Sequence, residues 1–299
     1  MPEHGYAVLP AFSYIFNSLN PGSINSPMVD EESGRFIYYF MAFGASIRGY
    51  AHMRKAVTVD GTHLSGKTMR HGASSSKILR PLSSTNQSST KAYTLEEFNE
   101  YFNALKERCP STAACLEHEV EFEKWSWAHF SDNRFNVMTS NIAESLNSML
   151  RDEREYPVVT IFNLIAHKFG EIFRKRYAEV KNSKTTFVPV AEMILRENMT
   201  KGDKLYANNI NGSTDGFAML GYGHSVKVNL LRWSRSCRKY DLVKLPCAHA
   251  MVTLRLKHGN EYDTSIYNYS SQIYSKESYL LAYLEPICAA PLESEWSVA

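Results

Sequence analysis

The sequence has little cysteine, no excess of charge of one sign and no long apolar run. Its 299 residues hold five scattered cysteines, which excludes a disulfide-stabilised secreted scaffold and favours a reducing compartment. Lys and Arg number 33 against 31 for Asp and Glu, so the formal charge of +2 excludes a polyelectrolyte. Since no run of about 18 uncharged apolar residues occurs and no basic segment opens the chain, we expect neither a membrane span nor a secretory leader.

Apolar residues make up 44% of the sequence and aromatic residues 12%, which is enough to form a folded core in one large or two ordinary domains. Residues 35–42 and 56–59 have the composition of short strands. The stretch 73–92 differs in kind, because it holds seven serines and two threonines and no apolar periodicity, as a linker does. The predicted divisions are an amino-terminal part (1–72), the linker (73–92), a helical region (93–202) and a β region with a finger-like segment at about 226–258 (203–299).

Helix signals dominate the middle of the chain. Thr94 and Glu97 have the spacing of a capping box, and Pro110 ends the helix that they begin. Ser111 is the expected cap of a second helix running towards Trp125, and Ser140 that of a third.

An apolar stripe at helical spacing predicts an amphipathic helix over residues 160–180, and a further helix is predicted from Pro189 to Gly202. From Leu205 the period changes to that of strands, with a turn at 211–212 and a strand at 224–231. Pro246 then predicts a helix to about residue 257, and a last helix is expected after Ser275.

The densest chemistry lies in Cys237, Cys247 and His249. Two thiolates and one imidazole within thirteen residues supply three of the four tetrahedral ligands that Zn²⁺ prefers. The alternative is that both cysteines are small buried apolar residues and that His249 is a polar residue at a helix end. The spacing alone does not decide between the two.

This segment resembles the SWIM zinc finger, whose pattern is Cys-x-Cys, a variable gap and then Cys-x-His. Cys237 matches the second cysteine, and Cys247 and His249 match the closing pair, but Arg235 stands where the first cysteine is expected. A guanidinium has no lone pair to donate, so a bound zinc ion needs a substitute ligand. His224 is the nearest upstream imidazole, and His258 or water are alternatives.

The same segment is strongly basic, although the whole chain is nearly neutral. From residue 226 to 258 it holds eight cationic side chains against Asp241 alone, a local charge of +7. Such a patch contacts DNA phosphates without reading base sequence, and the alternative is a solvated face with no partner. The candidate DNA contacts are Lys227, Arg232, Arg235, Arg238, Lys239 and Lys244.

A second resemblance covers most of the remaining chain. The segments that carry it are residues 6–10, 20–22, 40–45, 52–55, 59–67, 91–98, 125–130, 133–136, 138–147, 154–157 and 295–296. They are similar to plant Mutator-like element (MULE) transposases, a group in which a SWIM finger commonly follows the catalytic domain.

The resemblance implies an RNase H-like fold in which two aspartates and a glutamate hold two divalent cations for strand cleavage and transfer. Asp60 matches the first aspartate and Glu144 the glutamate, whereas the second aspartate and the strands that carry it have no counterpart. We therefore expect an inactive relic. On that expectation Asp60 is a carboxylate in a turn and Glu144 an exposed helical acid.

The sequence thus predicts an α+β protein with a truncated RNase H-like remnant, a mainly helical middle region, and a small β-hairpin with a helix as the finger. The amino-terminal portion is expected to pack poorly. The leading hypothesis is a nuclear, transposase-derived protein that binds zinc and DNA and does no chemistry. The alternatives are a metal-dependent transposase subunit, which needs Mg²⁺ or Mn²⁺, and a protein-interaction module; self-association or association with an intact transposase is the expected protein contact, and no membrane is expected.

Overall fold

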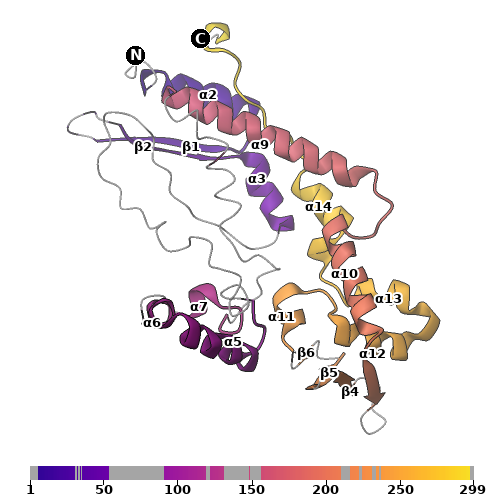
Figure 1. Ribbon diagram of the computed structural model, residues 1–299. Helices are drawn as coiled ribbons and strands as arrows, with labels where there is room; N and C mark the ends of the chain where they lie inside the picture. Colours follow the sequence, from indigo (N-terminus) through magenta and orange to yellow (C-terminus); the bar gives the residue numbers. More distant parts are fainter. Residues whose placement is uncertain are drawn as a thin grey trace. The chain divides into compact units, whose positions relative to one another are not determined.

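The structure is a computed structural model of the chain (Figure 1). The residues that it describes are 6–30, 32, 34, 36–53, 91–118, 122–130, 148, 156–209, 216–221, 224–230, 234–235 and 237–296. The chain divides into two compact units: unit 1 combines Met1–Ala73, Ser140–Val188 and Gln272–Ala299, and unit 2 combines Ser74–Thr139 and Pro189–Ser271. The four-part division made from the sequence stays a prediction. None of the described helices has the length and apolar character that a membrane crossing requires.

Unit 1 packs helices against a small β ribbon. Its elements are α2 (Leu9–Leu19), β1 (Ile24–Val29), β2 (Phe36–Ala42), α3 (Gly44–Gly49), η1 (Tyr50–His52), α9 (Val158–Lys181), η5 (Gln272–Tyr274), α14 (Lys276–Ala282) and η6 (Glu293–Glu295).

Helix α9 confirms the predicted amphipathic helix and begins two residues earlier than expected, after Pro157. Its buried stripe packs against α2, which lies alongside it (Figure 1). Phe12 and Phe16 of α2 are fully buried in this core, and burying each contributes roughly 2 kcal/mol. The expectation that the amino-terminal portion packs poorly is therefore wrong for α2, because its aromatic side chains complete the apolar surface of α9.

Strands β1 and β2 pair antiparallel, from Ile24 opposite Ala42 to Val29 opposite Phe36. The strand predicted at 35–42 is confirmed as β2. The predicted strand at 56–59, the linker up to residue 90 and the helix expected after Ser140, apart from Ser148, lie outside the described residues.

Two asparagine side chains fix the carboxy-terminal segment of unit 1. The amide of Asn20 donates to the Cys288 carbonyl at 2.8 Å and accepts from the Cys288 N–H at 2.8 Å. Asn163 on α9 holds Ala290 in the same two-way manner, at 3.0 and 2.7 Å. Each side chain satisfies both backbone groups of an extended residue, as a neighbouring strand does in a sheet.

Unit 2 combines a helical segment with a four-stranded sheet and its helices. Its elements are α5 (Leu95–Arg108), α6 (Pro110–His118), α7 (Phe122–Trp125), α10 (Pro189–Gly202), β3 (Tyr206–Asn209), β4 (Gly216–Gly221), β5 (His224–Asn229), β6 (Ser234–Arg235), α11 (Lys239–Val243), α12 (Ala248–His258), η4 (Gly259–Glu261) and α13 (Tyr262–Asn268).

The predicted capping box of α5 is confirmed. The Thr94 hydroxyl accepts from the Glu97 N–H at 3.2 Å, and the Glu97 carboxylate accepts from the Tyr93 N–H at 2.9 Å. The cap expected at Ser111 is wrong, because α6 already begins at Pro110. Proline suits a first helical position, where its missing N–H has no intrahelical partner to lose.

The sheet of unit 2 is antiparallel in the order β3-β4-β5-β6. The strand predicted at 224–231 is confirmed as β5, and α10 has the predicted bounds Pro189–Gly202. The predicted turn at 211–212 lies outside the described residues.

In unit 1 the predicted last helix is confirmed as α14, where the Ser275 hydroxyl accepts from the Ser278 N–H at 3.1 Å.

Helix α10 packs on α12 within unit 2. Gly202 makes this close approach possible, since a Cβ there would lie 3.1 Å from the Ala248 carbonyl oxygen. Asn198 of α10 also donates to the Pro246 carbonyl at 2.9 Å and so holds the residues that enter α12. The whole is an α+β protein, as predicted, and the two sheets of the described residues are small and antiparallel.

Candidate metal centre

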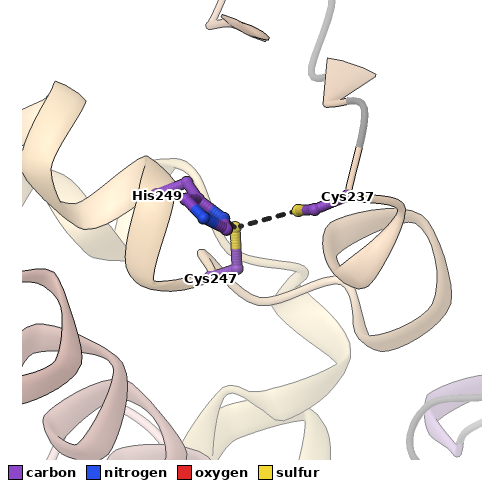
Figure 2. A group of neighbouring side chains, drawn as sticks. All are labelled: Cys237, Cys247 and His249. Atoms are coloured by element: carbon purple, nitrogen blue, oxygen red, sulfur yellow. Dashed lines mark hydrogen bonds between the residues drawn. The ribbon is translucent and has the colours of Figure 1, made fainter. Parts of the chain in front are cut away.

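Three elements of unit 2 bring the predicted ligands together. Cys237 lies in the turn between β6 and α11, Cys247 is the N-cap residue of α12, and His249 is the second residue of that helix. Figure 2 shows the three side chains gathered at the start of α12, with Cys237 reaching towards Cys247 from the adjacent turn.

The backbone around α11 explains how residues ten apart meet. Arg238 and Lys244, which flank this short helix, have positive φ angles of 51° and 60°. The left-handed conformation reverses the chain at each end, so α11 returns it from Cys237 to Cys247. Non-glycine residues rarely adopt this conformation, and both persist here because the surrounding contacts hold them.

The distances fit a tetrahedral ion. The Cys237 and Cys247 Sγ atoms are 3.7 Å apart, whereas two thiolates at 2.3 Å from one tetrahedral zinc ion are separated by about 3.8 Å. The Cys247 Sγ lies 4.0 Å from His249 Nδ1, and the three ligand atoms all lie within 4.8 Å of one another. The donor set therefore fits Zn²⁺ in both chemistry and spacing, with a fourth position left to fill.

The two cysteines are buried, and Cys247 stands at a helix N-terminus. Cys237 is 8% exposed and Cys247 2% exposed, while His249 is half-buried. Cys247 makes no side-chain cap hydrogen bond, and as the N-cap residue it stands at the positive end of the α12 dipole. That environment stabilises a thiolate.

Tyr93 is the neighbour of this cluster that the sequence did not single out as a site residue. Burial is the largest cause that raises the pKa of its phenol, and the charges of Glu97, Cys237 and Cys247 act in the same direction; together they raise it to about 12. Its ring meets the Trp127 ring edge-on at 5.0 Å. In the sequence, Tyr93 stood out only as part of resemblance segment 91–98. No local pattern predicts that the residues before α5 pack beside the cysteines.

Residues 125–130 carry part of the transposase resemblance, and two of their aromatic side chains are described. Trp127 is 2% exposed. Its ring packs beside Tyr93, and its buried indole N–H has no hydrogen-bond partner among the described residues. Phe130 is half-buried, and the Trp125 side chain lies outside the described residues.

The structure constrains the fourth ligand. His258, one candidate, is the last residue of α12, nine residues from His249, and its Nε2 lies 3.3 Å from the Tyr269 hydroxyl. Nine helical residues span about 13 Å along the axis, so His258 is too far to share the ion and that assignment is wrong. The backbones of His224 and Arg235 lie in β5 and β6, and their side chains are outside the described residues.

The candidate DNA contacts differ in what they already bind. Lys227 is exposed on β5. Lys239 Nζ lies 5.0 Å from the centre of the Tyr93 ring, and Lys244 Nζ lies 5.8 Å from that of Tyr240. Arg238 donates to two backbone carbonyls of unit 2, at 2.6 and 2.8 Å. Arg232 and the side chain of Arg235 are outside the described residues.

The two carboxylates of the transposase resemblance, Asp60 and Glu144, also lie outside the described residues. The catalytic part of the resemblance thus stays a prediction.

Comparison with known proteins gives no match to a protein family, to a curated protein or to a solved structure.

Proposed function

We propose that the chain is a transposase-derived protein that binds one zinc ion through Cys237, Cys247 and His249, contacts DNA phosphates and does not cleave DNA itself. The observation that carries the proposal is the 3.7 Å separation of the two buried sulfurs beside an imidazole. Zinc bound there supplies folding free energy, because it ties the turn after β6 to the start of α12.

The basic segment supports the DNA part of the proposal. Its side chains surround the cluster in sequence, so the metal fixes the backbone that carries them. The Arg238 guanidinium is already hydrogen-bonded inside unit 2, and the contacts therefore fall to the lysines, Lys227, Lys239 and Lys244, together with Arg232 and Arg235. Binding through these groups is electrostatic and weakens steeply as salt rises.

The inactive state follows from the sequence resemblance. Two metal ions in such a site need three carboxylates, and only Asp60 and Glu144 have counterparts here. The competing hypothesis, a metal-dependent transposase subunit, predicts DNA nicking with Mg²⁺ or Mn²⁺ that Asp60→Ala abolishes. The third hypothesis, an interaction module, predicts a self-associated species in light scattering.

The test is the metal content of the purified full chain, beside Cys247→Ser and Arg235→Cys. We expect one zinc per chain, lost in Cys247→Ser and bound more tightly in Arg235→Cys. Fluorescence anisotropy with a labelled duplex then measures DNA affinity against salt. A parent chain that takes up no zinc, or a DNA affinity that does not respond to salt, contradicts the corresponding part of the proposal.

A further inference from the structure

One short turn of unit 2 joins the metal centre to the helices α5, α6 and α7. It consists of Cys237, Arg238 and Lys239. Cys237 carries a candidate ligand atom, while the next two side chains reach the described helical segment of residues 91–118 and 122–130, here named the α5–α7 segment.

Arg238 makes the stronger of the two connections. Its guanidinium donates to the carbonyl oxygen of Ala128 at 2.6 Å and to that of Phe130 at 2.8 Å. A planar guanidinium satisfies two acceptors at once in a fixed geometry, so these bonds specify where the end of the α5–α7 segment lies. The backbone of Arg238 itself is left-handed, with a φ of 51°.

Tyr93 makes the second connection, at the other end of the α5–α7 segment. Lys239 Nζ lies over its ring at 5.0 Å, and the ring packs against Trp127. The aromatic pair therefore sits between the turn and the rest of the segment. Movement of the turn changes contacts at both ends of the segment together.

We propose that Arg238 is a positioning residue that couples metal binding to docking of the α5–α7 segment. This inference rests on the proposed zinc site. A metal ion fixes the position of Cys237, and the adjacent Arg238 then presents its guanidinium to Ala128 and Phe130. Coupling between two such events is reciprocal, so docking raises metal affinity by the same factor by which metal favours docking.

The test measures hydrogen exchange of the full chain by mass spectrometry, with saturating zinc and with a chelator. We expect zinc to slow amide exchange in peptides from 91–118 and 122–130 by about 5-fold or more, the lower end of typical coupling factors. Arg238→Ala removes this response and weakens zinc binding by the same factor. Arg238→Gly keeps the left-handed backbone accessible but lacks the guanidinium, and it has the same effect.

Arg255→Gln is the matched control. Arg255 also lies in unit 2 and pairs with Asp203, at the opposite end of α12 from Cys247. Its loss leaves both the zinc affinity and the exchange response unchanged. Cobalt substituted for zinc gives an absorption spectrum of the bound ion, which measures metal affinity directly. The Arg238 variants weaken the affinity of the chain for cobalt, and this readout does not depend on the stability of the fold alone.

The outcomes separate this inference from the proposed function. A wild-type chain that binds zinc with unchanged exchange in the α5–α7 segment overturns the coupling and leaves the zinc site standing. Arg238→Gly with wild-type zinc affinity also overturns it. A chain that binds neither zinc nor cobalt removes the site and the coupling with it.

Discussion

Replacing Cys247 by serine changes stability in opposite directions with and without zinc. Cys247 is the N-cap residue of α12, with extended backbone at φ −78° and ψ 171°, and it forms no side-chain cap bond. Serine is among the best N-cap residues, because its hydroxyl accepts from the N–H two or three residues further on, here that of Ala250 in the third position. The substitution therefore adds a cap as it removes a metal ligand.

The loss of the zinc contribution is the larger of the two effects. A serine cap contributes about 1 kcal/mol, and some of this is offset because the hydroxyl replaces a thiol that is 2% exposed. The metal-free variant is thus as stable as the parent or more stable by up to about 1 kcal/mol. Zinc at 100 times its Kd stabilises the parent by about 2.7 kcal/mol, and the variant loses this contribution.

Thermal unfolding followed by circular dichroism, in chelator and in excess zinc, measures both effects. We expect a zinc-dependent rise in Tm of about 5–10 °C for the parent and none for Cys247→Ser, whose Tm in chelator equals or exceeds that of the parent. Cys237→Ser is the control, since Cys237 lies in a turn and gains no cap; it loses the zinc response and is less stable in chelator. An equal zinc response in the parent and in Cys247→Ser would refute the reasoning.

Three further predictions concern the fourth ligand, the packing of α9 and the effect of pH. Arg235→Cys supplies the thiolate that the finger pattern expects, so we expect zinc affinity to rise at least about 10-fold. Competition with a chromophoric chelator measures this affinity, and an unchanged value means that the residue at 235 does not face the site. Gly170→Ala places a Cβ against the Ile287 carbonyl oxygen, and overpacking of this kind costs about 1–3 kcal/mol in urea unfolding; a stability equal to that of the parent shows that the carboxy-terminal segment yields. Burial, the largest cause, lowers the pKa of His129, Glu123 opposes this and Arg238 adds to it. The unfolded chain therefore binds a proton at this imidazole more readily than the folded chain does. The His129 contribution to the stability of the metal-free protein is complete above about pH 6.5 and is lost as the pH falls below that value. His129→Gln flattens the dependence of unfolding free energy on pH, and a variant with the slope of the parent contradicts the assignment of this dependence to His129.

The sequence predicted a structural feature correctly where the residues that form it lie close together in the chain. The capping box of α5 needs only Thr94 and Glu97, four positions that fold together whatever surrounds them. The buried stripe of α9 likewise follows from its own period of apolar residues. The gathering of Cys237, Cys247 and His249 was expected from their short spacing and from the finger pattern, and the structure brings them together.

Contacts between distant segments left no local signal. The sequence analysis predicted no helix at residues 9–19, yet α2 contributes two fully buried phenylalanines to the core of unit 1. Asn20 entered the sequence analysis only within the resemblance segment 20–22, and Asn163 entered no motif. Neither position signalled a clamp, because the partners lie 268 and 127 residues further along the chain. His258 was a candidate ligand only while the length of α12 was unknown, since an unbroken helix carries it away from His249.

The two asparagine clamps also bear on how the protein is made. A chain leaving the ribosome exposes α2 before the rest of unit 1, and the Cys288 backbone that Asn20 holds emerges 268 residues later. All of unit 2 is translated in between, so its helices and sheet have time to form while α2 and α9 still lack their last neighbour. Closure of unit 1 is thus a late, long-range step, and such steps are slow because the chain entropy is lost before the contact is gained. During that interval the apolar side chains of unit 1 that pack on Ile287 and Ala290 stay uncovered, and chaperones can bind them.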